Sequence, residues 1–249
     1  TDEANELLAA ALTQTKDYER AYKIMEGMKT KSALIQQAYQ KVTYYRAVEL
    51  FNDKKEDEAF SLCEKSLTNS LNTELKAFAI YMKAEIFYNH QNYDEAAKNY
   101  LLFAQYATTA LERKSEASKL RAYYNTGYCS FKKKSYSDAA LYFGNAIDES
   151  VSSADEKGKA LLLPDLYMRY SDCAFVTKNY SKAVDGYSKI ADMKWSGTEY
   201  ALYQKAIALG LMNRDEEKIS VLKLLIAKYN ASNYAVQANV ELGETYLQN

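Results

Sequence analysis

One spacing recurs through the whole chain and limits what it can fold into: a small residue is followed, twelve positions later, by an alanine just after a polar turn. The small residues are Ala9, Ala47, Ala84, Gly127, Ser171, Ala206 and Gly243. The intervals between them are 38, 37, 43, 44, 35 and 37 residues. Self-similarity at such a period is typical of stacked supersecondary units, each of which buries its apolar face against the next.

Helix packing accounts for this spacing. Two antiparallel helices of about 14 residues must approach closely where they cross, and small residues on both permit the approach. Apolar residues four and seven positions after the alanine, such as Phe143 and Ala146 after Ala139, continue the packed stripe. In the sixth unit Lys218 replaces the alanine. The pattern predicts helices near 2–14, 17–29, 32–53, 55–69, 73–90, 93–107, 112–133, 136–150, 163–177, 180–193, 198–212, 215–229 and 232–248.

Four of the turns carry a tyrosine three positions before the alanine: Tyr18, Tyr93, Tyr136 and Tyr180. We expect these rings to wedge between the paired helices. Together with the first-helix string Leu242-Gly243-Glu244-Thr245-Tyr246, this phase resembles the tetratricopeptide repeat (TPR) family, whose pattern runs Leu-Gly-x-x-Tyr and then Ala-x-x-x-Phe. The resemblance implies an all-α, right-handed α-solenoid of stacked antiparallel helix pairs, with six complete repeats and one half repeat in a single array over 1–249.

Two departures from the family pattern concern helix lengths. Extra residues fall at 108–120 and 152–163, and both inserts are predicted to lengthen helices, which the Ala-, Glu- and Lys-rich run 110–120 favours. The second insert is predicted to open with a loop and a helix N-cap at 152–155. Pro164 is predicted at the first position of the next helix, where its missing N–H costs no hydrogen bond. The family's early Trp and its closing Pro are absent from every unit.

Composition excludes several classes of protein. Eight Gly and one Pro are few for a sheet of hairpins, whose turns need both residues. A net charge of −1 lacks the basic field of nonspecific nucleic-acid or anionic-membrane binders, so we expect neither partner. No stretch approaches the about 20 apolar residues of a membrane-spanning helix, so no direct membrane insertion is expected.

Few residues are suited to catalysis. The single histidine, His90, lies at a predicted turn, where an exposed structural role is the simpler interpretation. Cys63, Cys129 and Cys173 are far apart and replace small or apolar stripe residues, which favours buried packing over a redox or zinc role. The glycines are too widely spaced for a phosphate-binding loop. We therefore expect no enzyme activity, no cofactor and no metal site.

Aromatic residues are the informative surplus, with 24 Tyr beside 8 Phe and 1 Trp. The family resemblance places the first helix of each unit on the inner, concave side. Positions three before, one after and four after the small residue are then expected to line a groove. Interfaces are enriched in such rings because they give rigid contact area. The alternative is that each ring packs against the neighbouring unit. The candidate groove residues are Tyr44, Phe51, Tyr81, Tyr88, Arg121, Tyr124, Tyr128, Phe131, Lys132, Met168, Phe175 and Tyr203.

The sequence thus predicts a non-catalytic protein–protein interaction scaffold that binds a peptide segment or protein surface in an aromatic concave groove, with Arg121 and Lys132 engaging a peptide carboxylate. The alternatives are a self-assembling structural array and the recognition module of a longer multidomain protein. The Tyr-Cys-x-Phe and Asp-Cys-x-Phe strings resemble the bacterial cell-envelope branch of the family, such as periplasmic coordinators of outer-membrane assembly and the Tol–Pal system. The final helix, 232–248, has first-helix character without a partner, so we expect 1–249 to be a fragment of a longer array whose end makes contacts through Val240 and Tyr246.

Overall fold

The computed structural model describes residues 2–68, 71–113 and 115–248, and these residues form helices and turns with no strand among them. The all-α fold class predicted from the sequence is confirmed. In chain order the helices are α1 (Asp2–Gln14), α2 (Tyr18–Glu26), α3 (Ala33–Asn52), α4 (Glu56–Thr68), α5 (Thr73–Asn89), α6 (Tyr93–Tyr106), α7 (Thr109–Glu112), α8 (Lys119–Lys132), α9 (Tyr136–Ser152), α10 (Glu156–Val176), α11 (Tyr180–Met193), α12 (Thr198–Leu211), α13 (Asp215–Lys228) and α14 (Asn233–Gln248).

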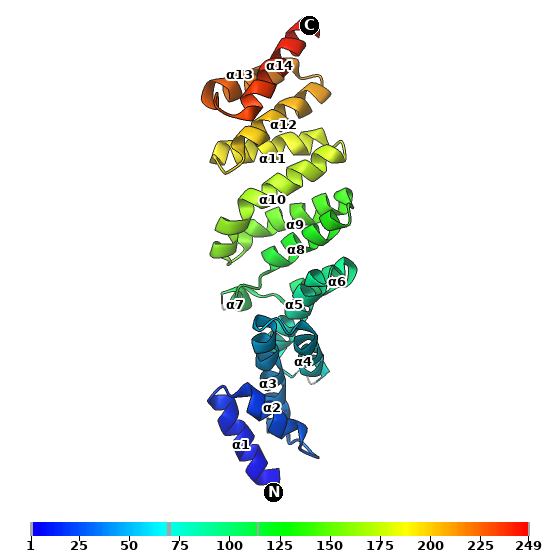
Figure 1. Ribbon diagram of the computed structural model, residues 1–249, viewed down its shortest axis with the longest axis vertical. Coiled ribbons are helices and arrows are strands. Elements are labelled where there is room, and N and C mark those ends of the chain that lie inside the picture. The colour runs from blue at the N-terminus through cyan, green and yellow to red at the C-terminus, as the bar shows by residue number, and fades with distance from the viewer. Residues whose placement is uncertain (1, 69–70, 114, 249) are drawn as a thin grey trace. The chain divides into compact units, whose positions relative to one another are not determined.

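The chain divides into two compact units, residues 1–122 (unit 1) and 123–249 (unit 2). Within each unit the helices stack in antiparallel pairs, each packed on the pair that follows (Figure 1). The first helix of a pair is α1, α3 or α5 in unit 1 and α10 or α12 in unit 2, while α8 begins in unit 1 and has most of its residues in unit 2; α14 holds the place of a first helix. That the two units continue one array of six and a half repeats stays a prediction.

Every turn between a first and a second helix has the same backbone geometry. The residue five positions before the second-helix alanine, or before Lys218, adopts a left-handed conformation with φ between 57° and 64°. The N–H that follows it closes the helix end by donating to a carbonyl five residues earlier, as Lys55 does to Leu50 at 2.8 Å and Asn179 to Ala174 at 2.8 Å. The six left-handed residues are Lys16, Lys54, Gln91, Lys134, Lys178 and Asn213.

The predicted close approach of small residues is confirmed in the described helix pairs. Ala84 and Ala96, for example, are both fully buried. Gly127 leaves no room for a side chain, because a Cβ there would lie 2.5 Å from Cδ1 of Phe143. In the sixth pair Lys218 is accommodated by running beside Gly210 and pairing its Nζ with Glu241 of α14 at 2.6 Å.

The first insert does not lengthen helices, and that prediction is wrong. α6 ends at Tyr106, the short α7 follows, and α8 begins only at Lys119. Thr108 caps α7 by accepting the N–H of Leu111 at 3.3 Å, and the buried Glu112 carboxylate accepts the N–H of Lys119 at 3.0 Å. These two side-chain bonds favour helix starts over one continuous helix, despite the helix-forming composition.

The second insert opens with the predicted loop and N-cap and, as predicted, lengthens a helix. Asp155 caps α10 by accepting the N–H of Gly158 at 2.7 Å, as the expected loop and N-cap required. α10 therefore begins at Glu156 rather than near 163, so Pro164 lies inside the helix and not at its first position. The prediction for Pro164 is wrong because the insert adds helix before it instead of loop.

None of the described helices is long and apolar enough to cross a membrane.

Candidate functional site

Ten of the predicted groove residues stand three before, one after or four after the small residue of a first helix, and the side of the helix that carries these positions is here called the first-helix face. Arg121, six before Gly127, and Lys132, five after it, flank these positions on α8 and are counted with the face. In unit 1 this face carries Tyr44 and Phe51 on α3, Tyr81 and Tyr88 on α5, and Arg121 at the start of α8, all half-buried. In unit 2 it carries the other seven, of which only Lys132 is largely exposed. The structure thus places each ring partly in the core and partly at the surface.

Three of the rings four positions after the small residue share one packing arrangement. Tyr88 meets Tyr93 edge-on at a centroid distance of 5.5 Å, Phe131 meets Tyr136 at 5.7 Å, and Phe175 meets Tyr180 at 5.6 Å. The second ring in each pair is a turn tyrosine, so the expected wedging of these tyrosines between paired helices is confirmed at three turns. Tyr18 instead stacks on Tyr45 of α3 at 5.1 Å.

Rings three positions before the small residue pack differently in the two units. In unit 1, Tyr44 stacks on Phe78 of α5 at 6.0 Å, and Tyr81 meets Phe103 of α6 edge-on at 4.9 Å. In unit 2, Tyr124 meets Tyr128 at 5.0 Å, and its hydroxyl donates to Oδ2 of Asp165 at 2.9 Å. In unit 2, the partner of this tyrosine on the next first helix is therefore a carboxylate instead of an aromatic ring.

Asp165 begins a polar network along α10. Its carboxylate accepts the hydroxyls of Tyr124 and Tyr128 on α8. Arg169, one turn later, donates from Nε to Oδ1 of Asp165 at 3.2 Å and to the Tyr128 hydroxyl at 3.3 Å. The guanidinium also lies over the ring of Phe131, 5.8 Å from its centroid. Two groove residues predicted from sequence, Tyr128 and Phe131, are therefore held by an arginine that sequence reasoning did not single out.

Asp172 ends the network on the same face of α10. It accepts the hydroxyl of Tyr187 on α11 at 2.8 Å and that of Tyr200 on α12 at 2.9 Å, while Arg169 lies 3.4 Å from its Oδ2. Burial raises the pKa of Asp172 above its ordinary value, and the two hydroxyls and Arg169 oppose this. Burial also raises the pKa of Tyr187, as does the adjacent Asp172 charge, so this hydroxyl stays a donor.

Ring contacts continue the network toward the end of the chain. Tyr200 meets Tyr234 of α14 edge-on at 5.6 Å, and Tyr234 lies 5.9 Å from Tyr203. Tyr124, Tyr128, Phe131 and Tyr203 thus belong to one chain of contacts through α8, α10, α12 and α14. Met168 packs toward Gly197 at the start of α12, outside the polar network.

Sequence reasoning missed Asp165, Arg169, Tyr187 and Tyr200; it placed Asp172, one position after Ser171, on the groove side but gave it no role. A signal for two of them was present. Asp165 and Tyr200 both stand six positions before a small residue, as Phe78 does in unit 1. This position contacts the preceding first helix in all three cases. The repeat spacing identifies this position six before the small residue in the sequence. Only the folded structure shows which neighbouring helix the position contacts.

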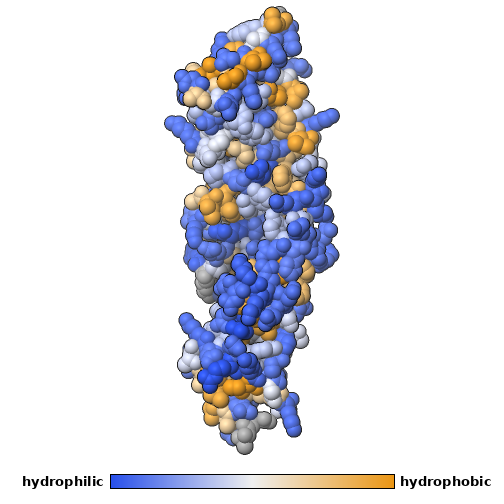
Figure 2. Space-filling model, in the orientation of Figure 1, coloured by the Kyte–Doolittle hydropathy of each residue, from blue (hydrophilic) through white to orange (hydrophobic). Residues whose placement is uncertain are grey.

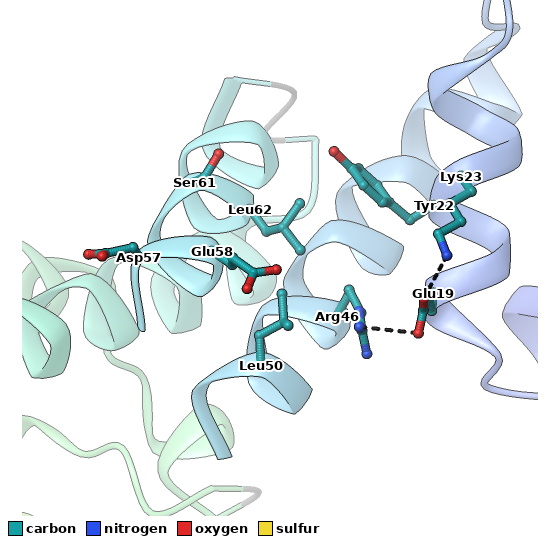
Figure 3. Close-up of a pocket in the computed structure, with 9 residues that line it drawn as sticks. All are labelled: Glu19, Tyr22, Lys23, Arg46, Leu50, Asp57, Glu58, Ser61 and Leu62. Carbon is teal, nitrogen blue, oxygen red and sulfur yellow. Dashed lines mark hydrogen bonds and ion pairs between the residues drawn. The ribbon is translucent and has the colours of Figure 1, made fainter. Parts of the chain in front are cut away.

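Unit 1 contains a pocket of about 490 Å³ between α2, α3 and α4 (Figure 3). Leu50 and Leu62 give it an apolar base, and the Glu58 carboxylate points into it. Arg46 pairs with Glu19 at 3.2 Å on the opposite wall. None of the predicted groove residues lines this pocket, so it is separate from the first-helix face.

The histidine and the cysteines that the sequence analysis weighed for catalysis lie in ion-pair and packing contacts. His90 stands at the end of α5, and its Nε2 lies 3.1 Å from Oε2 of Glu56, the first residue of α4. Cys63 and Cys173 are fully buried, and burial raises the pKa of each thiol to about 12. Reactive cysteines need the opposite shift. In the described part of the chain, no three His, Cys, Asp or Glu side chains are grouped so that they could hold a metal ion.

No family model and no curated protein matches this sequence. Solved structures do match the fold. A TPR protein called YrrB, described as having an unusual peptide-binding site, aligns with a TM-score of 0.55 at 14% identity, over 81% of this chain and 90% of its own. The C-terminal part of a TPR repeat-containing protein from Cytophaga hutchinsonii aligns with a TM-score of 0.57 at 17% identity, over 96% and 87%. PilF from Pseudomonas aeruginosa aligns with a TM-score of 0.50 at 17% identity, over 96% of both chains. The helical-repeat solenoid fold of this chain is therefore that of TPR proteins.

Proposed function

We propose that this protein is a non-catalytic interaction scaffold that holds a peptide segment of a partner protein on the first-helix face of unit 2. The observation that carries the proposal is the network of Asp165, Arg169 and Asp172, which fixes the hydroxyls of Tyr124 and Tyr128 on α8 and of Tyr200 on α12. A surface whose rings are already ordered loses little side-chain entropy when a partner binds.

The charges on this face give the peptide an orientation. Asp165 and Arg169 remain about one third exposed, with side-chain exposures of 36% and 35%, so both are accessible to a partner. Asp165 offers a carboxylate oxygen to peptide N–H groups. Lys132, at the end of α8, is exposed and has no partner among the described residues, so it is the group that receives a peptide carboxylate.

The predicted groove residues of unit 1 are proposed as a second stretch of the same kind. Tyr44, Phe51, Tyr81 and Tyr88 present half-buried rings, and Arg121 adds a cation. Unit 2 carries the Asp165–Arg169–Asp172 network on this face, so unit 2 is the candidate tested first.

The proposal is tested by selecting peptides on the whole chain by phage display and measuring affinity by fluorescence polarisation. Lys132→Glu is expected to weaken binding about tenfold, equivalent to about 1.4 kcal/mol, without changing the unfolding midpoint. Lys189→Glu is the matched control, because Lys189 is an exposed lysine on the second helix α11. Equal weakening by both variants would indicate nonspecific attraction, and no weakening by Lys132→Glu would remove this face from the site. Tyr124→Ala is unsuitable because that ring also packs 6.2 Å from Phe143.

Self-assembly is the second candidate function, and one observation favours it: the terminal helices α1 and α14 both expose leucines or valines. The cell-envelope likeness and the possibility of a recognition module within a longer protein stay predictions.

A further inference from the structure

The pocket between α2, α3 and α4 of unit 1 combines an apolar base with one acidic wall (Figure 3). Its base consists of Leu50 of α3 and Leu62 of α4, which are 3% and 5% exposed. The half-buried ring of Tyr22 completes the lining on the α2 side, and Lys65, which lies over this ring, is paired with Glu26 at 2.6 Å. The volume of about 490 Å³ lies within the range of ligand-binding pockets.

The two basic side chains that line the pocket are already paired within the chain. Arg46 of α3 donates from Nη1 to Oε2 of Glu49 at 2.8 Å, and its Nη2 lies 3.2 Å from Oε2 of Glu19. Lys23 of α2 donates to Oε1 of the same Glu19 carboxylate at 2.6 Å. The hydrogen bond from Lys23 and the charge of Arg46 lower the pKa of Glu19, so its carboxylate stays ionised between the two cations. The charges on the α2 and α3 walls are therefore compensated.

The α4 wall carries an acid that is not compensated. Glu56, Asp57 and Glu58 all lie in the first turn of α4, where the helix dipole favours acids. Glu56 pairs with His90, and the Asp57 carboxylate points away from the leucine base (Figure 3). The Glu58 carboxylate points into the pocket, and it forms no hydrogen bond or ion pair with another described residue. Glu58 is therefore the group that is available to a ligand.

A hollow at the same place in unit 2 separates what the fold supplies from what the sequence supplies. A pocket of about 540 Å³ lies there between α9, α10 and α11, again two successive second helices and the first helix between them. The stacking of helix pairs thus opens a hollow at this place in both units. The lining residue just before the second-helix alanine is Glu58 in unit 1 and Lys182 in unit 2. Helix packing therefore does not require a carboxylate at this position.

The occupant that fits the pocket of unit 1 is a side chain with an apolar stem and a cationic end. Figure 2 shows a mostly hydrophilic surface with separate apolar patches, which suits a polar partner segment rather than an apolar helix. The methylene stem of an arginine can cover Leu50 and Leu62. Its planar guanidinium binds a carboxylate through two parallel hydrogen bonds, which the ammonium group of lysine cannot form.

We propose that this pocket binds an arginine side chain of a partner protein, with the stem on Leu50 and Leu62 and the guanidinium on the Glu58 carboxylate. The pocket is separate from the first-helix face, so this site is additional to the peptide site proposed above and does not depend on it.

NMR of the whole chain, labelled at the leucine methyl groups, tests the proposal with N-acetyl-arginine amide as the probe. The methyl signals of Leu50 and Leu62 are expected to shift with probe concentration, whereas those of Leu209, a buried leucine of α12, should not. Glu58→Gln keeps the shape of the side chain and removes its charge, and it should weaken binding about tenfold. Glu3→Gln is the matched control and should bind like the wild type, because Glu3 is an exposed glutamate on α1 that does not line the pocket.

Related probes on the wild-type chain separate charge from apolar contact. N-acetyl-citrulline amide has nearly the shape of the arginine probe without its charge, and it should bind about tenfold more weakly. Equal affinity for this probe would overturn the role of Glu58, and equal affinity for N-acetyl-lysine amide would overturn the assignment to arginine. Tighter binding of N-acetyl-glutamate amide would mean that Arg46 and Lys23 recognise an anion instead.

The site as a whole can fail independently of the first-helix face. If the arginine probe shifted neither Leu50 nor Leu62, the proposed site would be wrong whatever peptides bind elsewhere on the chain. Circular dichroism of Glu58→Gln checks that the substitution at this exposed position leaves the helices folded.

Discussion

Units 1 and 2 carry residues of different chemistry at the same repeat position, six residues before the small residue of a first helix. In unit 1, the residue six positions before the small residue of α5 is Phe78, and it stacks on Tyr44 of α3. In unit 2 the equivalent residues are Asp165 and Tyr200, and each forms a tyrosine–carboxylate hydrogen bond to the preceding first helix. The position used for the contact between successive first helices is the same. The contact between α3 and α5 is a stacking of two rings, whereas those between α8 and α10 and between α10 and α12 are hydrogen bonds to a carboxylate.

A second pair shows what the two units share. Glu85 accepts the hydroxyl of Tyr100 at 2.7 Å in unit 1, and Asp172 accepts that of Tyr187 at 2.8 Å in unit 2. In both, the acid follows the small residue and the tyrosine stands four positions after the second-helix alanine. Unit 2 adds Tyr200 and Arg169 to this pair. A half-buried carboxylate is thereby given enough donors to remain in the interior, and repeats are joined through it.

The largest expected effect is the loss of Asp172. Asp172→Ala leaves the Tyr187 hydroxyl, on a side chain only 1% exposed, without its acceptor and removes a partner of Arg169. We expect the free energy of unfolding of unit 2 to fall by about 3 kcal/mol. Urea denaturation followed by the fluorescence of Trp195, the only tryptophan and a residue of unit 2, measures this unit directly.

Asp192→Ala is the control for this variant, because Asp192 is an exposed residue on α11 with no bond to another described residue. Its effect should stay within about 0.5 kcal/mol. If Asp172→Ala lowered the free energy of unfolding no more than Asp192→Ala does, the network would not stabilise unit 2. The structural difference between the units would then have no effect on stability.

A smaller effect is expected from removing single hydroxyls. Tyr200→Phe should cost about 1 kcal/mol, because its hydroxyl joins α12 to Asp172. Tyr44→Phe should change stability by less than about 0.5 kcal/mol, because Tyr44 is held by ring contacts and its hydroxyl has no hydrogen-bond partner in the described chain. Circular dichroism during urea unfolding compares the two, and equal costs would contradict the distinction between hydrogen-bonded and ring contacts.

The smallest effect concerns pH. Burial holds the pKa of Asp172 above its ordinary 3.8, so its protonation stabilises unit 2 at low pH, and this contribution is lost as pH rises through the folded-state pKa. For Glu26 in unit 1, burial also acts upward, but hydrogen bonds from Lys65 and Tyr39 outweigh it and hold the pKa below 4.5. The stability that Glu26 contributes is therefore present above 4.5 and lost as pH falls through its folded-state pKa.

Carboxyl-carbon NMR titration of both residues checks these directions. Asp172 is expected to titrate above 3.8 and Glu26 below 4.5. A midpoint for Asp172 below 3.8 would mean that Tyr187, Tyr200 and Arg169 outweigh burial, and that the network is electrostatically favourable at neutral pH.

The repeat phase was readable from the sequence because it reflects a strict steric requirement. Helices that cross closely need small residues at the crossing. Ala84 and Ala96 therefore predict a helix pair regardless of the residues around them. The inserts were less predictable. The helix-forming composition of 110–120 favoured one long helix, but Thr108 and Glu112 bind backbone N–H groups and start new ones. Local side-chain bonds of this kind overcome propensity, which is worth only tenths of a kcal/mol per residue.

What the sequence alone determined is the period, the all-helical class and the set of rings on the first helices. What the tertiary structure decided is the environment of those rings. Tyr44 and Tyr124 hold equivalent places in their repeats, yet one stacks on a phenylalanine and the other donates to Asp165. The physical reason is that the partner of each ring lies on the next first helix, some 34 to 41 residues away in sequence. A periodic pattern fixes where a side chain points along its own helix, whereas its neighbour across the interface is set only when the helices stack.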